Sequence, residues 1–347
     1  MGRRSRSLVA VARIAAWFGA VAPGFGATLV DAGLVWPTPN PAFQQGRPID
    51  AFVQPTATGI PESGLFGCVR NGGSRFHEGL DLFPLERDRR GEAADKVFAA
   101  LGGRVAYVNR VAGHSSYGRY LVLVHERASL PVYTLYAHLA SVRSDLSEGT
   151  RVTAGTPLGR MGRSAAGYTI PRSRAHLHFE IGFRLSDNFQ EWYDRRKFGS
   201  ANRHGNWNGM NLLGMDPLAF YADVRSGEAG SLREFVRNLP VVARIRVRAA
   251  TVPDFVRRYP ELLTRSPEEG AVAGWDIGFG AHGLPKVWTP LFEGDILGGR
   301  AGDIAVMAHD APRLQEQMCR PVRKAEGQRW SPSNHTLDTL RKLFGFR

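Results

Sequence analysis

The stretch of sequence that decides the fold is Ala-His-Leu-His-Phe-Glu at residues 175–180. Its alternation of polar and apolar residues is typical of a β-strand, in which successive side chains point to opposite faces of the sheet. His176 and His178 then share one face. Leu177 and Phe179 point to the other face and are expected in the core. The stretch therefore predicts two imidazoles side by side on one surface of a sheet.

A second stretch, Phe-His-Glu-Gly-Leu-Asp at residues 76–81, offers another histidine and a carboxylate. His77 and Asp81 have the same parity, but a fully extended chain would hold them about 13 Å apart at ~3.3 Å per residue. Their side chains can meet at one ion only if the chain bends at Gly79. Glycine permits such a bend and leaves space above it.

Two imidazoles and one carboxylate predict a zinc site with three protein ligands, and an open fourth position is typical of catalytic zinc. Zinc lowers the pKa of water towards about 7 and polarises an amide carbonyl, so peptide hydrolysis is the natural reaction. The histidine of the His-x-His pair that is not a ligand is expected to hold the water or stabilise the oxyanion. His138 is a second candidate for this role. A His-x-His pair alone is more often structural, so the prediction depends on the combination.

Length and composition describe an ordinary folded chain. Its 347 residues are enough for two modules, and 43% hydrophobic with 22% charged residues excludes a disordered chain and a polytopic membrane protein. Forty glycines and 21 prolines interrupt helices and favour short strands joined by tight turns. We therefore expect a mainly β protein.

The formal net charge of +13 suits polyanionic surroundings. Nucleic acid is not the expected partner, because basic residues are not interleaved with aromatic ones and no reading helix is recognisable. An acidic wall polymer or an anionic membrane surface fits the charge, and so does a purely solubilising surface. Peripheral contact with an anionic envelope is thus one of two interpretations, and the sequence does not indicate an oligomeric state.

The first residues predict export. Arginines precede a short apolar stretch and then small residues, which is typical of a cleaved signal at residues 1–27. The periplasm, the cell envelope and the extracellular space are the expected locations. Residues 28–64 hold six prolines after Trp36 and are interpreted as a linker and lead-in.

Two modules follow. Residues 65–221 contain short runs of β-branched and aromatic residues between glycine turns, which predicts an antiparallel β domain. Residues 222–347 predict a smaller α+β module. Its expected elements are a capped helix after Ser231, a strand at 244–248 with three arginines on one face, a helix opened by Thr251, Pro253 and Asp254, and a helix at 334–344.

Cys68 and Cys319 lie in different predicted modules and lack the spacing of metal ligands. Two cysteines fit an exported enzyme without a disulfide framework. Two separate buried thiols are the favoured interpretation, with a disulfide between them as the alternative.

Taken together, the motifs resemble those of the lysostaphin-like, or LytM-type, zinc metallopeptidases that cut peptidoglycan. The resemblance covers about residues 65–185. It rests on Phe66-Gly67-x-x-Arg70, His77-Glu-Gly-Leu-Asp81, Ala99-x-x-Gly-Gly-Arg-Val, Tyr117-Gly118, Thr134-Leu-Tyr-Ala-His138-Leu, Gly149-x-x-Val152-x-x-Gly155, Gly159-x-x-Gly162 and His176-Leu-His-Phe-Glu-Ile181.

The resemblance implies an exported zinc endopeptidase that hydrolyses peptide bonds in peptidoglycan stem or cross-bridge peptides, with one Zn²⁺ per chain. It implies the zinc ligands His77, Asp81 and His178. It also implies His138 and His176 as the catalytic pair that positions the water and stabilises the tetrahedral intermediate. All five positions are filled, which favours an enzyme over the non-catalytic members of the family.

The sequence departs from the family in two places. Residues 86–96 are a charged insertion, and residues 162–176 are longer and more basic than the usual turn. Both are expected to line the groove, and the polar loop at 202–211 is expected to extend its wall. Glu180 is either an outer partner of the site or a plain strand residue.

The remaining histidines have simpler interpretations. His125 is interpreted as a core histidine. The other five are expected at the surface or in loops: His114, His204, His282, His309 and His335.

Two other functions stay open. A non-catalytic protein of the same fold could recruit or activate a separate wall hydrolase. Alternatively, the second module could bind an anionic polymer through its basic strand, which would make the peptidase-like domain incidental.

Overall fold

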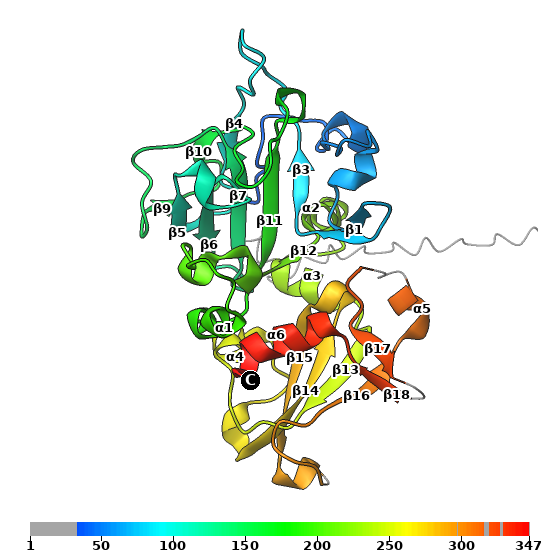
Figure 1. Ribbon diagram of the computed structural model, residues 1–347. Helices are drawn as coiled ribbons and strands as arrows, with labels where there is room; N and C mark the ends of the chain where they lie inside the picture. The colour runs from blue at the N-terminus through cyan, green and yellow to red at the C-terminus, as the bar shows by residue number, and fades with distance from the viewer. Residues whose placement is uncertain (1–32, 297, 316–318, 327–328, 347) are drawn as a thin grey trace, which may run out of the picture.

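The computed structural model describes residues 33–296, 298–315, 319–326 and 329–346 (Figure 1). The expected export signal at residues 1–27 lies outside them. Within the described ranges, no helix has both the length and the apolar character needed to span a membrane.

An antiparallel seven-stranded sheet carries both histidine motifs, in the strand order β12-β11-β7-β6-β5-β9 with β3 also paired to β11. The strands are β3 (Leu80–Leu82), β5 (Gly103–Asn109), β6 (Arg119–Val124), β7 (Tyr133–Leu139), β9 (Arg151–Val152), β11 (Leu177–Arg184) and β12 (Leu212–Met215). Smaller antiparallel sheets flank it, formed by β1 (Gly67–Arg70) with β2 (Arg75–His77), and by β4 (Lys96–Phe98), β10 (Pro157–Arg160) and β8 (Ser141–Val142). The prediction of a mainly β fold with an antiparallel sheet is confirmed.

Strand β11 is paired on both sides, with β7 on one and with β3 and β12 on the other, and it separates the core from the site. Leu177 and Phe179 on its core face are fully buried, as the alternation predicted. His178 and Glu180 on the opposite face are buried as well, beneath the loops that cover the sheet. Both faces of β11 are therefore covered, and its polar residues need partners inside the protein.

The lead-in is packed structure rather than the linker that its prolines indicated. Trp36 stacks on Phe43 with ring centroids 4.6 Å apart and meets the edge of Tyr221 at 4.9 Å. Phe52 is buried beside them. Large aromatic side chains in such a segment bury apolar area against the domain, which outweighs the low strand propensity of the prolines.

The C-terminal module is built on a second antiparallel sheet of order β15-β14-β13-β16, drawn in yellow and orange in Figure 1. Its strands are β13 (Ala243–Val247), β14 (Val272–Phe279), β15 (Pro285–Phe292) and β16 (Ile304–His309), with the hairpin β17 (Arg323–Glu326) and β18 (Arg329–Pro332). The α-helices of the described residues are α1 (Phe189–Arg196), α2 (Pro217–Ser226), α3 (Leu232–Asn238), α4 (Asp254–Arg258), α5 (Ala311–Gln315) and α6 (Asn334–Phe344). Short 3-10 turns are η2 (Ile49–Ala51), η3 (Pro61–Gly64), η4 (Ala112–His114), η5 (Arg172–Arg174), η6 (Gly205–Trp207), η7 (Gly209–Asn211), η8 (Pro260–Leu262), η9 (Pro267–Glu269), η10 (Ala281–Gly283) and η11 (Glu293–Asp295).

Helix starts in this module follow the sequence signals. The Ser231 side chain accepts from the Glu234 backbone N–H at the start of α3. Helix α4 begins at Asp254, and α6 occupies the predicted range. These signals are local, so they were readable without knowledge of the tertiary contacts.

The two modules share one hydrophobic core. Phe183 at the end of β11 meets Tyr259 edge-on, with ring centroids 4.9 Å apart, and the Tyr259 hydroxyl accepts from the Arg184 backbone N–H at 2.9 Å. On the other side, the Lys342 ammonium of α6 lies 4.4 Å from the ring centroid of Trp192 in α1. The C-terminal module therefore packs directly on the sheet that carries the histidines.

The expected row of arginines is present on β13 and the residue that follows it, Arg248, but two of its members are engaged. Arg246 forms a two-bond ion pair with Asp276, and Arg248 donates to the Gly298 carbonyl. Among the described residues Arg244 has no ion-pair partner, and it is exposed. The row therefore offers one free guanidinium rather than three.

Cys68 and Cys319 form a disulfide, so the favoured interpretation of two separate thiols was wrong. Their Cα atoms lie 5.7 Å apart although 251 residues separate them in sequence. Cys68 lies in β1, and Cys319 precedes β17 in the C-terminal module. The bond is therefore a covalent link between the module and the border of the histidine sheet.

Changing both cysteines to serine should lower the free energy of unfolding by about 2–5 kcal/mol, because the cross-link restricts the unfolded chain. Denaturant unfolding of the oxidised proteins measures the difference. Reduction should destabilise the wild type by a similar amount and leave the double variant unchanged. Equal midpoints for both proteins under oxidising conditions would contradict a stabilising role.

Candidate metal centre and active site

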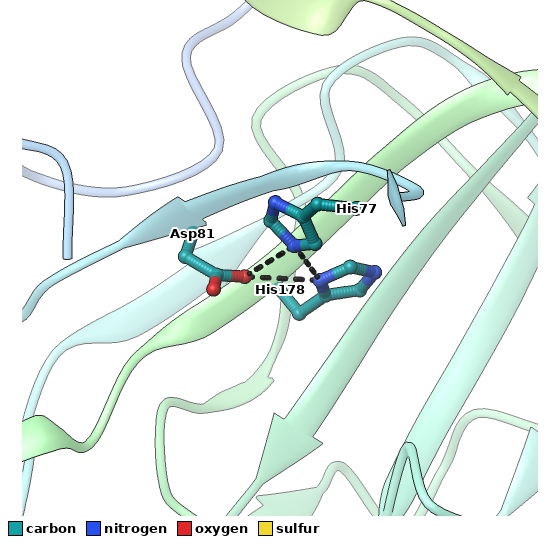
Figure 2. Close-up of side chains that lie close together, drawn as sticks. All are labelled: His77, Asp81 and His178. Atoms are coloured by element: carbon teal, nitrogen blue, oxygen red, sulfur yellow. Dashed lines mark hydrogen bonds and ion pairs between the residues drawn. The ribbon is translucent and has the colours of Figure 1, made fainter. Parts of the chain in front are cut away.

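Three side chains from strands β2, β3 and β11 converge on one point (Figure 2). His77 Nε2 lies 3.0 Å from His178 Nδ1 and 3.1 Å from Asp81 Oδ1, and His178 Nδ1 lies 2.9 Å from the same oxygen. His77 ends β2, Asp81 lies in β3, and His178 lies opposite Asp81 in the β3–β11 register. All three are buried.

The bend that the sequence required is present at Gly79. Strand β2 ends at His77 and β3 begins at Leu80, so the break falls on the two residues between them. A Cβ atom at Gly79 would lie 2.3 Å from the backbone oxygen of Phe179. Only glycine lets this turn approach β11 closely enough to bring His77 and Asp81 to His178.

The donor set fits a metal cation. His77 Nδ1 lies 2.6 Å from the Leu65 carbonyl oxygen, and His178 Nε2 lies 2.9 Å from Glu180 Oε1, so these nitrogens carry the ring protons. Once a cation displaces any proton between them, the nitrogens that face each other can supply lone pairs, together with a carboxylate oxygen. Tetrahedral zinc with ligands at about 2.0–2.2 Å separates its ligand atoms by about 3.3–3.6 Å, a few tenths of an ångström more than the spacing here.

Asp81 is held as a carboxylate. Burial opposes its charge, yet His77 and His176 hold the pKa of its carboxyl well below the usual range. Its second oxygen, Oδ2, accepts from the Arg70 guanidinium. Arg70 thus orients the carboxylate so that Oδ1 points at the two imidazoles, a role that the sequence motif alone did not assign.

His138 and His176 lie beside the three converging residues, with their ring centroids 4.8 Å apart. His138 Nδ1 is 2.9 Å from the Ser164 carbonyl oxygen, and His176 Nδ1 is 2.7 Å from that of Arg174. These contacts leave Nε2 of each ring as an acceptor. Burial lowers the pKa of both imidazoles, so both are neutral near pH 7 and able to take a proton.

The backbone at His138 is in the left-handed region, with φ 59°. Its N–H donates to the Tyr117 carbonyl at 2.9 Å, and its carbonyl accepts from the Ser164 N–H at 3.3 Å. This conformation costs a non-glycine residue about 1–2 kcal/mol and is typical of functional positions held by their surroundings. His138 lies near the end of β7, and with this backbone conformation its imidazole lines the cavity.

Glu180 is the outer partner of His178 rather than a plain strand residue. Its buried carboxylate accepts from the Tyr117 hydroxyl at 2.6 Å and from the Tyr133 hydroxyl at 2.7 Å, in addition to His178. Burial and the charge of Glu180 raise the pKa of both phenols, which stay protonated as donors. The shared strand parity allowed the contact to His178 as one of two interpretations, and no local signal indicated the two tyrosines.

Glu180→Gln should weaken zinc binding about 10–100-fold, because the carboxylate fixes the ring orientation of His178 and raises its basicity. Competition with a chromogenic chelator measures the affinity. Tyr133→Phe, which removes one hydrogen bond and keeps the carboxylate, is the matched control and should have a smaller effect. Unchanged affinity in Glu180→Gln would show that the contact does not tune the ligand.

All five predicted residues line one cavity of about 260 Å³. Tyr168, Thr169, Ile170 and Arg174 also line it, so the segment 162–176 borders the groove as expected.

The insertion 86–96 contributes no lining residue to this cavity, contrary to expectation. Instead it supports the segment 162–176 from behind: Glu92 pairs with Arg163 at 2.8 Å and with Arg172 at 3.2 Å. The carboxylate of Glu92 in the insertion thus holds the segment 162–176 in place.

The histidines outside the site differ from one another. His125 is a buried core residue between the Gly102 carbonyl and the Thr134 hydroxyl, as interpreted from the sequence. His204 is buried rather than exposed, with Nδ1 at 2.9 Å from the Tyr107 hydroxyl. His282 of the C-terminal module packs against Phe76, with ring centroids 5.1 Å apart. The sequence around His204 and His282 is polar and rich in glycine, so it did not indicate that these two side chains are packed.

Comparison with known proteins identifies one matching family. Residues 75–189 match the model of Peptidase family M23, which confirms the resemblance to lysostaphin-like peptidases for this segment. None of the curated proteins compared with the chain matches it.

Three similar solved structures have TM-scores below 0.3. The lysostaphin catalytic domain from Staphylococcus simulans is 19% identical, with 46% of this chain and 87% of that chain covered and a TM-score of 0.28. A point mutant of the catalytic domain of the prophage-encoded M23 protein EnpA from Enterococcus faecalis is 19% identical (38% and 79% covered, TM-score 0.26). A zinc-containing peptidase from Vibrio cholerae is 25% identical (38% and 33% covered, TM-score 0.26).

Proposed function

We propose that this chain is a zinc-dependent endopeptidase that hydrolyses peptide bonds in peptidoglycan stem or cross-bridge peptides. One observation carries the proposal: two imidazole nitrogens and a carboxylate oxygen lie within 3.1 Å of one another, and the other nitrogen of each ring faces a protein oxygen. The match to Peptidase family M23 supports the reaction class.

The ligands would be His77, Asp81 and His178. Zinc held there supplies a Lewis acid that lowers the pKa of water and polarises the peptide carbonyl. The chain supplies the proton transfers. His138 and His176 each present an acceptor Nε2, which can take a proton from the attacking water and return it to the leaving amine, and a protonated ring can donate to the developing oxyanion.

A non-catalytic binding protein is the alternative. A binder needs the groove but has no use for two neutral histidines next to a complete ligand set, one of them held in a left-handed backbone conformation. The joint presence of all five residues in one cavity therefore favours the enzyme.

Export to the periplasm, the envelope or the medium belongs to the same proposal. The disulfide supports it, because disulfides persist in oxidising compartments. The net charge of +13 supports contact with an anionic envelope.

Digestion of purified sacculi tests the proposal. Zinc-loaded wild type should release soluble fragments, and their masses identify the bond that is cut. His178→Ala should release none. A zinc-loaded wild type that binds sacculi and releases no fragment would favour the binding protein instead.

A further inference from the structure

A second cavity of about 550 Å³ adjoins the first one and shares four of its lining residues. The shared residues are Arg75, Glu78, Ser116 and Tyr117. The loop that was expected to extend the groove forms much of its remaining wall, from Ser200 to Met210. The two cavities therefore form one continuous depression that runs away from the zinc ligands.

The C-terminal module contributes Arg320 to this wall. Its guanidinium lies 3.7 Å from the ring centroid of Phe76, and Nη2 lies 2.6 Å from Glu78 Oε1. Glu78 follows the ligand His77 directly in sequence. Arg320 follows Cys319, so the disulfide to Cys68 holds it at this place. The module thus reaches the immediate border of the metal site.

The lining of the second cavity carries an excess of positive charge. Its arginines are Arg75, Arg203 and Arg320, and its one carboxylate, Glu78, is already paired with Arg320. Arg75 and Arg203 are both exposed, and neither has an ion-pair partner in the part of the chain that the structure describes.

His204 of the lining adds little to this charge. Burial lowers the pKa of His204, whose Nε2 lies 2.9 Å from the His114 carbonyl oxygen. Two guanidinium groups therefore remain free to bind an anion.

We propose that the second cavity is a carboxylate-binding subsite that holds an anionic part of the substrate peptide next to the bond to be cut. Guanidinium groups match carboxylates with two parallel hydrogen bonds, which gives both affinity and orientation. The inference rests on the proposed function and narrows it: the chain prefers stem-type peptides with free carboxylates to neutral, glycine-rich cross-bridges. It also gives the C-terminal module a role, as one wall of this subsite.

Peptide binding to the metal-free protein tests the subsite without hydrolysis. The probes are a stem-type peptide with free carboxylates, the same peptide with its carboxylates amidated, and pentaglycine. Wild type should bind the free-carboxylate peptide about tenfold or more tightly than the amidated one, as a charge-assisted pair implies. Equal affinity for these two peptides would overturn the proposal.

Variants of the lining arginines test whether the preference for the free-carboxylate peptide comes from the second cavity. Arg75→Gln and Arg203→Gln should each remove most of the preference for the free carboxylate. Arg320→Gln should also reduce it, because it leaves the charge of Glu78 facing the ligand. Arg244→Gln removes the same charge from the exposed face of β13 and is the matched control. A loss in Arg244→Gln as large as in Arg75→Gln would show a general charge effect and overturn the assignment.

Hydrolysis by the zinc-loaded protein separates this proposal from the proposed function. Arg75→Gln should raise KM for the carboxylate peptide with little change in kcat, because it removes binding common to substrate and transition state. Cleavage of pentaglycine as efficiently as of the stem peptide would overturn the subsite and keep the peptidase. Preferential binding without cleavage of any peptide would keep the subsite and overturn the peptidase.

Discussion

His77→Ala, Asp81→Ala and His178→Ala should each lose most of the bound zinc and all measurable turnover. Each change removes one of three protein ligands, and two protein ligands do not hold zinc firmly. The purified wild type should contain about one zinc per chain. Elemental analysis of the dialysed proteins measures the metal, and cleavage of sacculi measures the loss of function.

His309→Ala is the matched control, because His309 is exposed and lies in β16, outside the ligand set and both cavities. It should keep its zinc. Stoichiometric zinc in both His77→Ala and Asp81→Ala would contradict the ligand assignment.

His138→Ala and His176→Ala should keep the metal and lower kcat about 10²–10⁴-fold, the range for removal of a general acid or base. Their Nδ1 atoms are engaged by backbone carbonyls, and their Nε2 atoms are acceptors at the cavity. Single-turnover cleavage together with zinc analysis distinguishes loss of proton transfer from loss of metal.

His138→Asn provides a second test at that position, because asparagine tolerates the left-handed backbone conformation better than most residues. It should resemble His138→Ala in both zinc content and rate. If either alanine variant loses zinc as completely as His178→Ala does, the division between ligands and proton-transfer residues is wrong.

The centre of the site could be predicted because its determinants are local. Alternation along a strand placed His176 and His178 on one face, and the distance between His77 and Asp81 required the bend at Gly79. Both features depend on backbone geometry within a few residues. The structure adds what brings the two stretches together, the pairing of β3 with β11.

The contacts that surround the site could not be predicted, because they join residues that are far apart in the sequence. The disulfide and Arg320 join positions more than 240 residues apart, as the 242-residue separation of Arg320 from Glu78 shows. No periodicity carries information about such contacts. The lead-in is different: Trp36, Phe43 and Phe52 were visible in the sequence, and so many large aromatic residues argue against a solvated linker.

The disulfide also sets the order in which the protein can mature. Cys319 is synthesised 251 residues after Cys68, so the bond cannot form while the histidine sheet alone has emerged. The wall that carries Arg320 is consequently the last part of the groove to be secured. Once the bond has formed, a single proteolytic cut between the two cysteines leaves both pieces covalently joined. The chain thus combines late completion of its groove with resistance to being split by a single proteolytic cut.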